Sequence, residues 1–93
     1  MISLEIKKIR KKLDKLDSKL LLIIKGRTNL VNQVIKLKKR KNEIVDKKRI
    51  NFILKRIKEN SMKIKVDPKI TVNIWKVMIK GFINYEFRKF KKK

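Results

Sequence analysis

The sequence predicts an all-α protein with one long helix and two shorter helices. Apolar residues recur every three or four positions over long stretches, which is the spacing of one face of a helix. No segment shows the alternation of apolar and polar residues that marks a half-buried strand. The 93 residues include two glycines and one proline, so few positions interrupt the helical pattern.

The first helix is expected to run from about residue 3 to about residue 40. A helix of that length extends over roughly 55 Å and cannot bury its apolar stripe against itself. No proline interrupts it, and the sequence KKRKNE at 38–43 is expected to end it. The stripe consists of Ile2, Ile6, Ile9, Leu13, Leu16, Leu20, Ile23, Leu30, Val34 and Leu37.

The second and third helices each follow an aspartate that can cap a helix. Asp46 is the expected N-cap of a helix that reaches about Asn60. Asp67 precedes Pro68, which suits the first helical position, and this third helix is expected to reach Phe90. Two short helices leave much of the long stripe uncovered. We therefore expect a single small domain over residues 1–93 that pairs with a second copy of the chain.

The composition is strongly basic and lacks two chemically important residue types. The chain has 30 Lys and Arg residues against 8 Asp and Glu residues, a formal net charge of +22, which favours anionic partners such as nucleic acid, acidic lipid or a small polyanion. The absence of Cys and His excludes disulfides and the usual zinc and iron sites, and no metal or cofactor is expected. The longest apolar run, LLLII at 20–24, is too short to cross a bilayer, and no signal peptide is evident. A soluble, cytoplasmic protein is expected.

Two cationic residues of the first helix stand out. Arg27 occupies a position in the apolar stripe, and Lys38 lies eleven residues later, about 20° away around the axis and roughly 16 Å along it. Both side chains can therefore converge on one bound anionic group. Arg10 lies about 100° from Arg27, so it could reach such a pocket only in a partner chain. The structural alternatives are an Arg27 that fixes register or extends to the edge of the stripe, a solvated Lys38, and an ion pair of Arg10 with Asp14.

A carboxyl group interrupts the apolar face of the third helix. Glu86 continues the series Trp75, Ile79 and Phe82. A buried carboxyl needs a partner or a proton. Lys89, three residues later, is the local candidate for that partner.

Three segments in this order resemble the all-α chorismate mutases. They are IRKKLDKLDSKLLLIIKGRTNLVNQVIKLK, VDKKRINFIL and IWKVMIKGFINYE, and the resemblance covers about residues 4 to 90. It implies a chorismate mutase-like domain that intertwines with a second copy in a helical bundle, with two identical sites that mix both subunits. The implied activity is the conversion of chorismate into prephenate for phenylalanine and tyrosine synthesis. The implied substrate is a small dianion.

The resemblance also implies which cations bind the substrate. Arg27 and Arg49 would each bind a carboxylate, and Arg10 would reach the neighbouring subunit's site. Guanidinium groups suit this task because they match carboxylates in bidentate geometry.

Further roles implied by the resemblance concern the reacting atoms. Lys38 would donate to the ether oxygen of the substrate, and Asp46 would offer its backbone near the ring hydroxyl. Glu86 stands where the family has Gln or Glu donating to the same ether oxygen. The rearrangement is unimolecular and needs no nucleophile, metal or base, so a chain without His or Cys can perform it.

Two positions depart from the family pattern. Ile50 replaces a glutamate that accepts from the substrate hydroxyl in many members, and Phe82 replaces a small hydroxyl residue at the substrate-binding site. The related isochorismate-pyruvate lyases share the fold and lack that acid, so lyase activity is the alternative. A non-catalytic basic dimer that binds nucleic acid is a further alternative. Nucleic acid is not the expected partner, because no recognition helix or aromatic stacking platform is evident.

Overall fold

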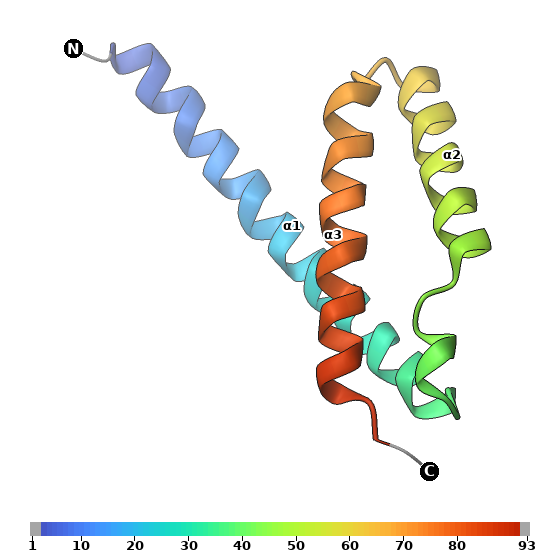
Figure 1. Cartoon of the computed structure of the whole chain (residues 1–93). Helices are drawn as coiled ribbons and strands as arrows, with labels where there is room; N and C mark the ends of the chain where they lie inside the picture. The colour runs from blue at the N-terminus through green and yellow to red at the C-terminus, as the bar shows by residue number, and fades with distance from the viewer. Residues whose placement is uncertain (1–2, 92–93) are drawn as a thin grey trace. The chain divides into compact units, whose positions relative to one another are not determined.

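The computed structural model describes residues 3–91 and shows three α-helices (Figure 1). They are α1 (Leu4–Leu37), α2 (Lys47–Lys63) and α3 (Pro68–Lys89), and a 3-10 turn, η1 (Lys41–Glu43), follows α1. Within residues 3–91 there is no strand, and no helix there has the length and apolar character needed to cross a bilayer. The predicted all-α class with one long and two shorter helices is confirmed. Ile2 of the predicted stripe lies outside the described residues.

Both predicted N-caps are confirmed. The Asp46 side chain accepts a hydrogen bond from the backbone N–H of Arg49 at 3.0 Å, and the Asp67 side chain accepts from that of Lys69 at 2.9 Å. Each carboxylate replaces a carbonyl partner that the first turn of a helix lacks. The starts of α2 and α3 are therefore set by local sequence.

The end of α2 has a feature that the sequence did not reveal. The N–H of Val66 donates to the carbonyl of Ser61 at 2.9 Å, and that of Lys65 donates to Met62 at 3.3 Å. These two bonds form a Schellman motif, which requires a left-handed residue between helix and loop. Lys65 supplies it with φ 60°, where glycine is usual. The helix thus ends at Lys63 with a strained backbone at the next turn.

The chain divides into two units, residues 1–30 and 31–93. The described part of the first unit belongs almost entirely to α1, and its stripe is exposed. Leu13, Leu16 and Leu20 keep 52%, 59% and 51% of their surface accessible. A single helix offers no second element of its own to cover these side chains.

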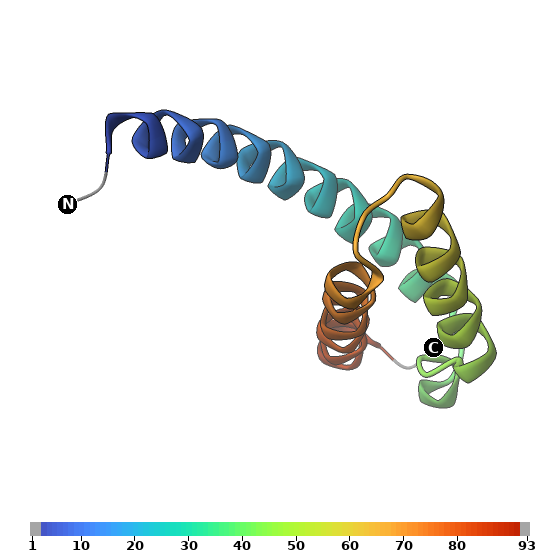
Figure 2. The ribbon, with the colours of Figure 1, turned by 90° about the horizontal axis from the view of Figure 1, so that it is seen from above.

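The second unit contains α2 and α3, which lie side by side and antiparallel (Figures 1 and 2). The loop at residues 64–67 joins them, as the view from above shows (Figure 2). The hydroxyls of Ser61 on α2 and Thr71 on α3 share a hydrogen bond of 2.6 Å. The buried apolar side chains of the unit are Ile35, Ile44 and Ile79. Because this core is small, polar contacts are important for holding the helices in register.

Candidate active site

Lys38 and Glu86 form an ion pair. The Lys38 Nζ donates to Glu86 Oε1 at 2.9 Å, and the two side chains are 18% and 11% exposed. Lys38 directly follows α1, and its backbone N–H still bonds to the carbonyl of Val34. Glu86 lies in the last turns of α3. The structure therefore brings together two of the three residues predicted to be catalytic.

This ion pair identifies Lys38 as the hydrogen-bond partner of the Glu86 carboxylate. The carboxyl is buried and accepts from the distant Lys38, whereas the ammonium of its local candidate, Lys89, lies 5.9 Å from the centre of the Tyr85 ring. Burial of a charge is costly unless an opposite charge compensates it, and here each group compensates the other. The carboxylate also restrains the flexible lysine side chain, so the ammonium stays close to Glu86.

A depression of about 570 Å³ lies beside Lys38, between the end of α1 and the start of α2. Its volume falls within the range of small-molecule sites. Three lysines and two acidic residues are among the residues that line it, so the lining has a net positive charge. Predicted site residues Lys38 and Asp46 share its wall. The lining residues are Lys38, Asn42, Glu43, Val45, Asp46, Lys47 and Lys48.

Asp46 and Arg49 are both exposed at the start of α2. The carboxylate of Asp46 is used in capping the helix, which fixes the backbone of this turn against the depression. The guanidinium carbon of Arg49 lies 5.6 Å from the centre of the Phe52 ring. This cation–π contact holds the Arg49 side chain against the surface of α2.

Phe82 lies half-buried on α3, one turn before Glu86. Its ring meets that of Tyr85 edge to face, with centroids 6.4 Å apart and planes at 86°. The Tyr85 hydroxyl in turn donates to Asn32 Oδ1 on α1 at 2.7 Å. Neither Tyr85 nor Asn32 was among the predicted site residues. No local signal in the sequence marked this contact, because Asn32 and Tyr85 lie 53 residues apart.

Arg10 and Arg27 belong to the first unit. Arg10 is exposed, and Arg27 is half-buried on α1 beside Thr28, whose hydroxyl donates to the carbonyl of Ile24 at 2.9 Å. The roles of both arginines in a site stay predictions. Ile50, the departure from the family pattern, lies half-buried on α2.

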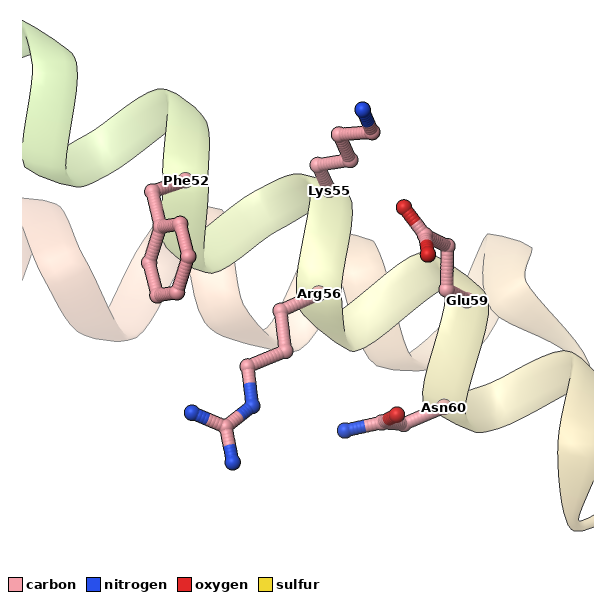
Figure 3. Close-up of a pocket in the computed structure, with 5 residues that line it drawn as sticks. All are labelled: Phe52, Lys55, Arg56, Glu59 and Asn60. Atoms are coloured by element: carbon pink, nitrogen blue, oxygen red, sulfur yellow. The ribbon is translucent and has the colours of Figure 1, made fainter.

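A second depression, of about 320 Å³, lies on the outer face of α2 (Figure 3). Figure 3 shows Lys55 and Glu59 on one side of the helix and Arg56 and Asn60 on another. With Phe52, these four residues line it, and none was a predicted site residue. All five residues belong to α2, so this hollow lies along a single helix. Among residues 3–91, no three Asp or Glu side chains gather where they could hold a metal ion.

Comparison with known proteins gives one match. The sequence model of the family described as chorismate mutase type II matches residues 9–87. The matched range includes Arg10, Arg27, Lys38, Asp46 and Glu86. No curated protein and no solved structure matches the chain.

Proposed function

Because the chain belongs to the chorismate mutase type II family, we propose that it converts chorismate into prephenate in the synthesis of phenylalanine and tyrosine. The observation that carries this proposal is the Lys38–Glu86 pair beside a cationic depression. We place the reaction in the cytoplasm.

The reaction needs a folded dianion and stabilisation of negative charge on the breaking ether oxygen. The Lys38 ammonium, held by Glu86, is the group that we assign to that oxygen. One such preorganised donor lowers a barrier by roughly 3–4 kcal/mol, which is the magnitude measured for oxyanion donors. Holding the substrate in its reactive chair supplies much of the remaining acceleration.

Cationic side chains would hold the two carboxylates of the substrate. We assign Arg27 and Arg49 to this task in one subunit and Arg10 to the site of a second subunit, so that two copies form two shared sites. The exposed stripe of α1 supports this arrangement, since Leu13, Leu16 and Leu20 gain a covering surface when a second chain packs there. Arg49 would leave the Phe52 ring to bind substrate, a rearrangement of one exposed side chain.

Lyase action on isochorismate is the second candidate, and Ile50 and Phe82 favour it. An apolar side chain at position 50 accepts no hydrogen bond from a ring hydroxyl, and the Phe82 ring fills space that a small hydroxyl residue leaves open. Both changes alter recognition of the ring hydroxyl. The Lys38–Glu86 pair suits either reaction, because both reactions break the bond between a ring carbon and the ether oxygen of an enolpyruvyl group.

The decisive experiment supplies chorismate and isochorismate separately and identifies the products by chromatography. We expect prephenate from chorismate at a rate that exceeds the release of pyruvate and salicylate from isochorismate. A preference for isochorismate would establish the lyase. Failure with both substrates, together with binding of oligonucleotides that weakens steeply with salt, would instead favour a nucleic-acid-binding dimer.

A further inference from the structure

Two hydrogen bonds join the end of α1 to α3, and they start from adjacent residues of α3. Tyr85 Oη donates to Asn32 Oδ1 at 2.7 Å, and Glu86 Oε1 accepts from Lys38 Nζ at 2.9 Å. All four residues belong to the second unit. A change in the separation of α1 and α3 at the Tyr85–Asn32 contact would therefore also move the Lys38 ammonium.

The α1 side of this junction consists of side chains on successive turns. Asn32, Ile35 and Lys38 are spaced by three residues, which places neighbours on adjacent positions of a helix face. Ile35 between them is buried, whereas Asn32 and Lys38 are half-buried. Few buried apolar side chains thus separate the two polar contacts, and little else in this small core sets the register.

The Tyr85 ring is held on several sides. The Phe82 ring meets it edge to face at 6.4 Å, and the cationic groups of Arg88 and Lys89 each lie 5.9 Å from its centre. A tyrosine side chain also has only two torsion angles between backbone and ring. The hydroxyl consequently points in a defined direction, unlike the end of a lysine or glutamate side chain.

We propose that Tyr85, through its hydrogen bond to Asn32, is a positioning residue that sets the place of the Lys38 ammonium relative to the bound substrate. The Lys38–Glu86 pair consists of two flexible side chains, so it can persist at several separations of α1 and α3. The short bond between a rigid phenol and a short amide selects one of them. This inference rests on the proposed function, because its consequence is a rate.

The test is the kinetics of Tyr85→Phe, which keeps the ring and its contacts with Phe82 and removes the hydroxyl. We expect kcat to fall about tenfold, since an ammonium displaced by a fraction of an ångström stabilises the transition state less well. KM should stay within about twofold, because uniform binding of the dianion is unaffected. Asn32→Leu should show the same fall, and the double variant should lose no more than either single variant.

Ser61→Ala is the matched control. It also removes a hydroxyl hydrogen bond between helices, but it does so between α2 and α3. We expect it to lower Tm while leaving kcat unchanged. If Tyr85→Phe and Asn32→Leu lower Tm without lowering kcat, their bond is structural and the inference is wrong. Wild-type protein without turnover of either substrate would overturn the proposed function and this inference together.

Discussion

At the scale of single residues, Lys38 takes part in an ion pair and also lines a depression. It donates to the buried carboxylate of Glu86, and its side chain lines the depression at the start of α2. A lysine in water samples many rotamers, whereas a lysine paired with a carboxylate samples fewer. The ion pair thus keeps the cation close to Glu86 and beside a depression of small-molecule size.

Lys38→Met removes the charge and keeps the length of the side chain. We expect kcat to fall by about 10²–10³-fold, because the lost contact is strongest in the transition state. Steady-state kinetics with chorismate will measure this loss, and circular dichroism will show that the helices are retained. Lys58→Met, an exposed lysine of α2, is the control and should leave kcat unchanged. Nearly unaltered turnover by Lys38→Met would show that Lys38 has been misassigned.

Glu86→Gln keeps the shape of the side chain and changes its hydrogen bonding. The amide oxygen still accepts from Lys38, and the amide nitrogen adds a permanent donor for the ether oxygen. We expect this variant to keep its fold and a kcat at or above that of the wild type. Glu86→Leu leaves the Lys38 ammonium half-buried without its carboxylate, and it should lower the free energy of unfolding by about 3 kcal/mol. Chemical denaturation and kinetics will compare the two variants. An inactive but folded Glu86→Gln would show that the negative charge of Glu86 is needed, and it would exclude a gain from an amide donor at this position.

At the scale of helices, the helix starts could be predicted from neighbouring residues, but the contacts between helices could not. Asp46 and Asp67 predicted the starts of α2 and α3 correctly, because a cap and the turn that it caps are neighbours in sequence. The partner of Glu86 could not be assigned in the same way, since Lys38 lies 48 residues away and Lys89 is near. The Tyr85–Asn32 bond was missed for the same reason. Periodicity identifies the buried face of a helix, but it does not specify which turn of another helix that face meets.

The end of α2 provides a test that is independent of function. Lys65 adopts φ 60°, a conformation that costs an ordinary residue roughly 1 kcal/mol relative to glycine. Lys65→Gly should therefore raise the free energy of unfolding by about 1 kcal/mol, as measured by chemical denaturation. The matched variant Lys58→Gly places glycine within α2 and should lower it by about the same amount. Equal destabilisation by both variants would show that the left-handed turn is not strained.

At the scale of the whole molecule, charge and exposed apolar surface act in opposite directions. A net charge of +22 on 93 residues repels a second copy of the chain, and the uncovered stripe of α1 attracts one. Salt screens the first effect and leaves the second nearly intact. Association should consequently strengthen as ionic strength rises, which is opposite to the behaviour of a complex with nucleic acid.

We predict a dimer of twice the 11.3 kDa chain mass, with a Tm that rises with protein concentration. Analytical ultracentrifugation at micromolar concentration will measure the mass. Leu20→Glu, which puts a charge on the exposed stripe, should weaken the dimer and abolish turnover, whereas the neighbouring Lys19→Glu should preserve both. A folded, fully active monomer would contradict the shared site.

The two hydrogen bonds between α1 and α3 also have a consequence for the order of folding. They connect residues 48 and 53 positions apart, whereas the bonds within α1 close loops of a single turn. Loop closure over such distances is slow compared with the growth of a helix. During synthesis α1 can form as soon as it is made, but its contacts with Tyr85 and Glu86 must wait until α3 has been made. Catalytic competence should therefore appear after helical structure in a refolding experiment.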